Sequence, residues 1–238
     1  MDRIPYPSPS DIVRLNEQIP SWSISSRDFQ VKSNANSQND LFTPFEISAW
    51  SKMLGYRLKE TDYSFIMASY YLEKGIPDEE WYSATETGIS YFPKFNEEHD
   101  ANKFGFEYYS DVYFYKAFST LDTIAHILTL VYNLTWDEKE KISFFNAVNK
   151  IKQIAPDLYK KLKSIMTSTR YRKINRLRNN STHNFSDGYV DSGVVRKNNK
   201  TLLTVGNYMT SKEKYSLMQW MCKNLIGIIN LIKTKSLI

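Results

Sequence analysis

Apolar residues recur every three to four positions over most of this chain of 238 residues, and this spacing predicts long helices. One such helix is expected over residues 43–73. Thr43 can cap its start, Glu46 completes a capping box, and Gly55 is where a break could fall. The strongest pattern covers residues 104–134 and predicts a long central helix. Its apolar stripe consists of Tyr113, Ala117, Leu121, Ile124, Leu128, Val131 and Tyr132.

Further helices are expected in the second half of the chain. Trp136 precedes one of them, with Asp137 as its cap and Pro156 as its end. Two more are expected over residues 157–167 and 170–182. A capping box at Thr210-Ser-Lys-Glu213 starts the closing helix. The apolar stripe expected after Trp136 consists of Ile142, Phe145, Val148 and Ile151.

The remaining segments lack helical spacing. Four prolines in residues 1–43 exclude a long helix, so we expect an extended N-terminal arm there, followed by one helical domain over residues 44–238. Residues 78–103 are interpreted as a connecting segment, with a short helix after Pro77 as the alternative. Weak alternation around residues 190–208 indicates a small β-hairpin or a mobile flap. The predicted fold class is all-α.

Composition limits which partners, covalent links and compartment are expected for the protein. A net charge of +5 permits an anionic partner without requiring one. The single cysteine, Cys222, excludes an internal disulfide. The longest apolar run, residues 225–232, is too short to span a bilayer, and no secretory signal opens the chain. We therefore expect a cytoplasmic protein that makes no use of a membrane.

The most chemically suggestive stretch is Arg176-Leu-Arg-Asn-Asn-Ser-Thr-His-Asn-Phe185, in which four residues separate Arg178 from His183. An arginine can hold a phosphate and a histidine can move a proton, which together suffice for phosphodiester cleavage without a metal. On an unbroken helix, five residues turn by about 140°, so the two side chains would not share a face. We expect convergence if the helix ends between them, which the polar run favours, or if they line two walls of one cleft. The alternative is a solvated arginine beside a helix-end histidine.

The run Arg178-Asn-Asn-Ser-Thr-His183 resembles the Arg-(4 to 6 residues)-His motif of the HEPN superfamily. Asn179 matches the polar residue that often follows the arginine. HEPN domains are all-helical, and their motif comes late in the chain before a closing helix, as it does here. The resemblance covers residues 104–238 and, less fully, residues 43–75. It implies a helical bundle of the HEPN type around the long central helix.

The resemblance also implies an activity, which is metal-independent cleavage of single-stranded RNA at a composite site formed by a homodimer. His183 would act as general acid or base on the ribose 2′-OH or the leaving 5′-oxygen. Arg178 would hold the scissile phosphate, and Asn179 would position one of the two. No metal or other cofactor is implied. Such a nuclease would fit a toxin or defence effector with a protein antitoxin or regulator, although Phe185 replaces the tyrosine that is modified in one antitoxin-controlled subset.

Other charged residues could support this site. Asp122 is expected to orient Arg178, with a locally satisfied pair of Asp122 and His126 as the alternative. The basic run before the motif indicates either a surface that tracks RNA phosphates or the solvated face of a helix pair. The residues expected to bind RNA are Lys163, Arg170, Arg172, Lys173 and Arg176.

Two other classes of function remain open from the sequence. Some HEPN proteins are inactive, so the chain could be a non-catalytic module that binds nucleotide, RNA or a protein partner. It could also be a helical interaction protein whose aromatic surface makes the contacts. With three histidines and one cysteine, widely separated, the sequence predicts no metal site.

Overall fold

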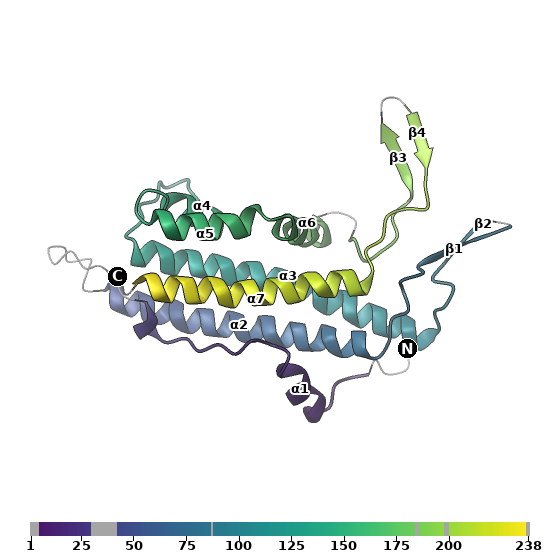
Figure 1. The fold of residues 1–238 in the computed structure, drawn as a ribbon, viewed down its shortest axis with the longest axis horizontal. Coiled ribbons are helices and arrows are strands. Elements are labelled where there is room, and N and C mark those ends of the chain that lie inside the picture. Colours follow the sequence, from purple (N-terminus) through teal and green to yellow (C-terminus); the bar gives the residue numbers. More distant parts are fainter. Residues whose placement is uncertain (1–4, 30–41, 87, 184–185, 198–199, 237–238) are drawn as a thin grey trace. The chain divides into compact units, whose positions relative to one another are not determined.

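The computed structural model describes residues 5–29, 42–86, 88–183, 186–197 and 200–236, apart from the side chains of residues 182–183 and 234–236. These residues are mostly helical (Figure 1), which confirms the all-α fold class and the long central helix. The helices are α1 (Pro9–Asn16), α2 (Thr43–Glu73), α3 (Glu97–Val131), α4 (Phe144–Lys150), α5 (Pro156–Thr167), α6 (Thr169–His183) and α7 (Ser211–Ser236), with a 3-10 turn η1 (Ser26–Asp28). The strands form two antiparallel hairpins, β1 (Tyr82–Thr85) with β2 (Gly88–Tyr91) and β3 (Val194–Lys197) with β4 (Lys200–Leu203).

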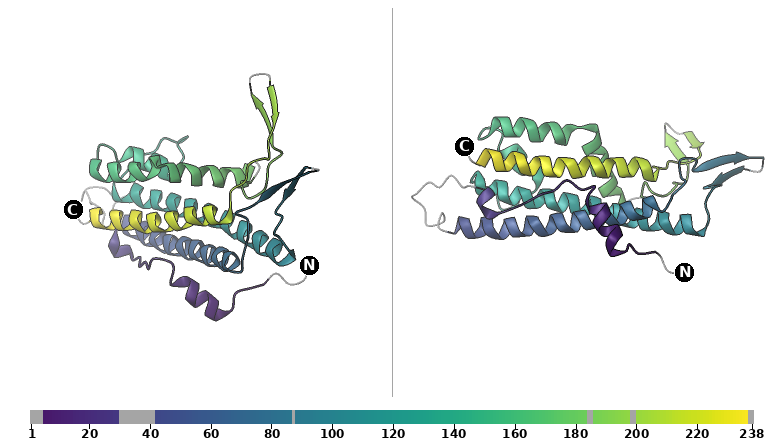
Figure 2. Two further views of the ribbon diagram at one scale, coloured as in Figure 1. Left: turned by 45° about the vertical axis from the view of Figure 1, so that its right-hand side comes forward. Right: turned by 60° about the horizontal axis from the view of Figure 1, so that its bottom comes forward.

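The chain divides into two compact units, and the long helices contribute residues to both. Unit 1 consists of Met1–Gln18, Asp62–Phe114 and Lys173–Gln219. Its core is aromatic: the buried Tyr113 ring meets Phe65 edge-on, and the Tyr113 hydroxyl donates to the carbonyl of Met218 at 2.9 Å. Both hairpins belong to this unit and extend beyond its helices in Figure 1, and β1–β2 also does so in both views of Figure 2.

Unit 2 consists of Ile19–Thr61, Tyr115–Arg172 and Trp220–Ile238. Its parts of α2 and α3 are joined by an ion pair between Lys116 and Glu60, 3.1 Å apart. The apolar stripe expected for α3 is largely buried here, as are the apolar residues of α5 and α7. The buried residues include Leu121, Ile124, Leu128, Leu158, Leu162, Met166, Leu225, Ile228, Ile229 and Ile232.

Several predicted helix boundaries are confirmed. The helix α2 runs from Thr43 to Glu73 without a break at Gly55. By contrast, Pro156 was expected to end the helix before it, but α4 already ends at Lys150, and Pro156 begins α5 because its fixed backbone angle suits the first turn. At the start of α7, the Thr210 hydroxyl accepts from the backbone N–H of Glu213 at 3.3 Å. The hairpin expected between residues 194 and 205 is also present, with Val194 opposite Leu203.

The helix expected from Trp136 is wrong in its start. Residues 132–143 are not helical, and α4 begins only at Phe144, where the Ser143 hydroxyl accepts from the backbone N–H of Asn146 at 3.3 Å. Local contacts hold the preceding loop, since the Lys150 ammonium lies 4.9 Å from the centre of the Trp136 ring. In the expected stripe, Val148 and Ile151 are buried, whereas Phe145 is exposed and Phe144 is buried instead.

Two other segments contain more structure than expected. Residues 78–103 include the β1–β2 hairpin and the first turns of α3, with no helix after Pro77. The N-terminal arm is not extended throughout, because Ser8 and Asp11 form a capping box that starts α1 at Pro9. The domain boundary expected after residue 43 stays a prediction. In the part of the chain that the structure describes, no helix has the length and apolar character needed to cross a membrane.

Candidate functional site

The motif lies at the end of α6, which begins at a serine cap. The Ser168 hydroxyl accepts from the backbone N–H of Tyr171 at 3.2 Å, and the buried residues Ile174 and Leu177 fix which face of the helix points inward. The helix continues to His183, so the expected end between the two motif residues is wrong. Five residues of helix turn by about 140°, which places positions 178 and 183 on different faces of α6.

Asn179 holds the guanidinium of Arg178. The Arg178 Nη2 donates to Asn179 Oδ1 at 2.8 Å and to Asn175 Oδ1 at 3.3 Å, and the arginine is half-buried. These neutral acceptors orient the guanidinium while keeping its positive charge uncompensated by them. The contact agrees with the positioning role that the resemblance implies for Asn179. The side chain of His183 and all of Phe185 lie outside the described residues.

Asp187 ties the end of α6 to the chain that follows the motif. Its carboxylate accepts from Asn180 Nδ2 at 3.0 Å and lies 3.7 Å from Arg176 Nη2. Its backbone carbonyl accepts from the N–H of Met209, just before α7, at 3.0 Å. The motif segment is thereby linked to both the loop after it and the start of the closing helix.

A buried lysine holds the next residue of this loop. Lys103, on α3, donates from Nζ to the carbonyl of Gly188 at 2.6 Å, and its ammonium lies 5.1 Å from the centre of the Tyr189 ring. Burial lowers the pKa of Lys103, because desolvation outweighs the attraction of nearby acids such as Glu107. An ammonium that is buried but hydrogen-bonded to a backbone carbonyl fixes where the loop can lie.

A second buried lysine lies beneath the same loop. Lys214, on α7, contacts Glu107 Oε2 at 2.5 Å and Asp111 Oδ1 at 2.9 Å. Burial disfavours its charged form, but the charges of Glu107 and Asp111 prevail and raise the pKa of Lys214 above its ordinary value. Gly188 packs directly on this pair, since a Cβ there would lie 1.8 Å from Glu107 Oε2. Only glycine fits at that position without moving the carboxylate.

Asp78 fixes the N-terminus of α7. The buried Asp78 carboxylate accepts from the backbone N–H and the hydroxyl of Ser211, both at 2.8 Å, and from the Tyr208 hydroxyl at 2.5 Å. A carboxylate at a helix N-terminus is stabilised by the exposed N–H groups there. Burial, together with the hydrogen bond to Asp78 and its charge, raises the pKa of Tyr208.

Reasoning from the sequence missed this buried polar network. Its members come from four separate segments, and no short motif joins them. One signal was present: Lys103, Glu107 and Asp111 are spaced by four, so they share one face of α3 within an otherwise apolar pattern. The network supports the loop that follows the motif.

Asp122 and His126 lie in unit 2 and have local partners there. Asp122 Oδ1 accepts from the backbone N–H of Phe144 at 3.1 Å, at the start of α4. The His126 ring stacks on Trp50, with centroids 3.8 Å apart and planes 7° from parallel. Burial lowers the pKa of His126 despite the nearby Asp122 charge. The expected support of Arg178 by Asp122 stays a prediction.

The basic residues expected to bind RNA have different surroundings. Arg170 and Arg172 are exposed on α6, whereas Lys173 is paired with Glu213. Arg176 is exposed on its side-chain surface but lies near Asp187, and Lys163 donates to Asn149 Oδ1 at 3.2 Å. Their role in RNA binding stays a prediction.

Comparison with known proteins places the chain in a family. The sequence model of the family described as Cthe2314-like HEPN matches residues 50–233, which is more than three quarters of the chain. Searches of curated proteins and of solved structures each returned no match. The matched region runs from α2 through α3 and the motif-bearing α6 into α7. The chain belongs to the Cthe2314-like HEPN family, within the HEPN superfamily.

Proposed function

We propose that the protein is a metal-independent endoribonuclease that cleaves single-stranded RNA, in the role of a toxin or defence effector. RNA carries its own nucleophile, the ribose 2′-OH, so a site needs proton transfer and stabilisation of the anionic phosphorane. His183 supplies the proton transfer, and Arg178 binds the scissile phosphate. Membership of a HEPN family supports this reading.

The observation that best supports the proposal is the way in which the guanidinium of Arg178 is oriented. Its guanidinium is oriented by two neutral amide oxygens, those of Asn175 and Asn179. A guanidinium oriented in this way loses little rotational freedom when an anion binds.

The unbroken helix favours a site shared between two chains. Positions 178 and 183 differ by about 140° around α6, so one chain presents them on different faces. In a homodimer with two-fold symmetry, the arginine of one protomer and the histidine of its partner can face the same phosphate. Two equivalent composite sites then form at one interface.

Single substitutions test the activity. Arg178→Ala and His183→Ala should each reduce cleavage of a fluorescently labelled single-stranded RNA by at least about 100-fold in the presence of a chelator, with unchanged circular dichroism. Lys139→Ala serves as the control and should retain activity, because Lys139 is an exposed cation outside both the motif and the residues expected to bind RNA. Persistent cleavage by either motif variant would remove the proposal.

A second function is favoured by one observation. Lys173 and Arg176 lie beside Glu213 and Asp187, which reduces the net positive charge next to the motif. A non-catalytic HEPN module that binds nucleotide, RNA or a protein partner does not need a strongly positive surface next to the motif, so the reduced charge is compatible with it. Binding of RNA that weakens with salt, together with no cleavage by the wild type, would favour this second function over the first.

A further inference from the structure

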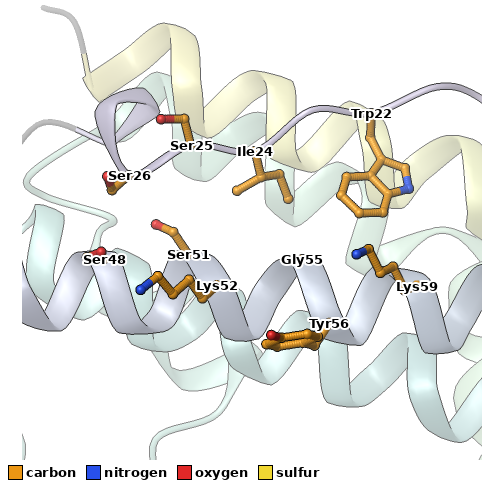
Figure 3. A pocket seen from close by; sticks show the side chains of 10 residues that line it. All are labelled: Trp22, Ile24, Ser25, Ser26, Ser48, Ser51, Lys52, Gly55, Tyr56 and Lys59. Carbon is orange, nitrogen blue, oxygen red and sulfur yellow. The ribbon is translucent and has the colours of Figure 1, made fainter.

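A pocket of about 400 Å³ lies in unit 2 between the segment around η1 and one face of α2 (Figure 3). The lining residues that the structure describes combine positive, hydroxyl-bearing and aromatic side chains, and none of these residues is a carboxylate. The lining residues are Trp22, Ile24, Ser25, Ser26, Ser48, Ser51, Lys52, Gly55, Tyr56 and Lys59. Nothing in the HEPN motif or in the buried network of unit 1 involves these residues.

The wall of the pocket opposite α2 is held in place by several contacts. Ser25 and Asp28 form a capping box around η1, and Asp28 is paired with Lys233 of α7 at 2.9 Å. Lys233 also donates to the carbonyl of Ser23, and Phe29 is buried. The segment that carries Trp22 and Ile24 is therefore fixed to the helices of the same unit.

The floor of the pocket is one face of α2. Ser48, Lys52, Gly55 and Lys59 are spaced by four, three and four residues, which aligns them along the helix. The two lysine positions are about 10 Å apart along the axis. Between them, a Cβ added to Gly55 would meet nothing within 4 Å, so the glycine leaves open space inside a helix where it costs stability.

The two ends of the pocket differ in chemistry. Figure 3 shows Lys52 with the serine hydroxyls at one end, and Trp22 with Lys59 at the other. An ammonium and several hydroxyls suit a phosphate group, whereas an indole and a second ammonium suit a planar ring. Ile24 and Gly55 lie between the ends and provide an apolar passage.

We propose that this pocket binds a phosphate monoester that carries an aromatic ring, with the phosphate at Lys52 and the ring at Trp22. Two ammonium groups, with no carboxylate among the described lining residues, favour an anion over a neutral ligand. The span of about 10 Å between the lysine positions suits a ligand of the size of an aryl phosphate or a nucleoside monophosphate. The proposal is independent of the proposed ribonuclease activity, because ligand binding here uses none of the motif residues and involves no chemical reaction.

Isothermal titration calorimetry on the full chain tests it. The probes are phenyl phosphate and adenosine 5′-monophosphate, with inorganic phosphate and adenosine as the two halves. We expect saturable one-to-one binding of at least one monoester, at least ten times tighter than its halves. If both monoesters bind equally, the aryl phosphate portion suffices. If only the nucleotide binds, the natural ligand is a nucleotide.

Substitutions locate the binding. Gly55→Leu fills the open space and should weaken binding at least ten-fold, while raising helix propensity so that the protein folds. Gly227→Leu is the matched control, because Gly227 is an exposed glycine of α7 with nothing within 4 Å of its added Cβ. Lys52→Ala should also weaken binding about ten-fold or more, through loss of a charge-assisted hydrogen bond.

Three results would overturn the proposal. One is the absence of saturable binding of either monoester to the wild type. The second is a monoester that binds no tighter than inorganic phosphate or adenosine, since both ends are then not used together. The third is an affinity that is the same in Gly55→Leu and in Gly227→Leu, since the ligand then binds elsewhere.

Discussion

Removal of the Lys214 ammonium is the most informative perturbation of the folded state. Its side chain is 1 % exposed, and that of its partner Glu107 is 4 % exposed. Glu107 Oε1 has no hydrogen-bond partner in the part of the chain that the structure describes, so the carboxylate depends on Oε2 and Lys214. In Lys214→Met, the carboxylate remains buried while its counter-charge is gone.

The expected cost follows from that burial. Breaking a buried pair by removing one partner costs about 3–5 kcal/mol, because the remaining charge is left without compensation. For a chain of this size, that loss lowers Tm by roughly 6–20 °C. In Lys214→Met with Glu107→Leu, both buried charges are gone and the remaining partner Asp111 is 29 % exposed to water, so most of the lost free energy of unfolding should return.

Urea unfolding followed by circular dichroism measures these free energies. The matched control is Lys94→Met, because Lys94 and Glu80 form an ion pair of 2.9 Å with side chains 56 % and 69 % exposed. Exposed pairs contribute about 0–1 kcal/mol, so this control should change little. A single variant Lys214→Met that is as stable as the control would refute the reasoning. So would a double variant less stable than the single one, because the stranded carboxylate would then not be the cause.

Three further predictions follow from the same structure. Gly188→Ala should destabilise the protein by about 1–3 kcal/mol, because the added methyl group clashes with the Glu107 carboxylate beneath it. Gly55→Ala should be neutral or stabilising by up to about 1 kcal/mol, because it raises helix propensity. Equal effects of the two substitutions on the free energy of unfolding in urea would contradict this. Because burial lowers the pKa of His126 from 6.5, the unfolded chain takes up a proton below that pH that the folded chain resists, so stability falls as pH decreases. His126→Phe should reduce the fall in Tm between pH 7.5 and 5.5, and an unchanged fall would count against the buried neutral ring. Asn179→Ala should lower the kcat of RNA cleavage roughly ten-fold or more by releasing Arg178, with full activity as the contradicting result.

The helical framework was largely readable from the sequence. Local signals set its boundaries, such as Thr43 at the start of α2 and the Thr210 hydroxyl before α7. The start of α4 was not readable from the sequence. Trp136 precedes acidic residues typical of a first helical turn, but its ring instead contacts the Lys150 ammonium in a loop before α4. Side-chain contacts between distant residues outweighed local propensity there.

The candidate site was predictable to a smaller extent. The pairing of Arg178 with Asn179 concerns adjacent residues, and the motif itself suggested it. The support of the loop by two buried lysines was not predictable. Lys103 is 85 positions from its partner Gly188, and Lys214 is 107 positions from its partner Glu107, so no local sequence pattern indicates either contact. The helix expected over residues 170–182 is present as α6, but Asn179 and Asn180 are poor helix formers and were interpreted as favouring an end between Arg178 and His183 that the structure does not have.

The central claim is that Arg178 of one protomer and His183 of its partner act on one phosphate. Mixing the inactive variants Arg178→Ala and His183→Ala, with subunit exchange verified by mass spectrometry, tests it most directly. Half of the dimers are then mixed, and one of the two sites in each mixed dimer regains both residues, so activity should return to about a quarter of wild type. An inactive mixture with exchanged subunits would contradict the shared site.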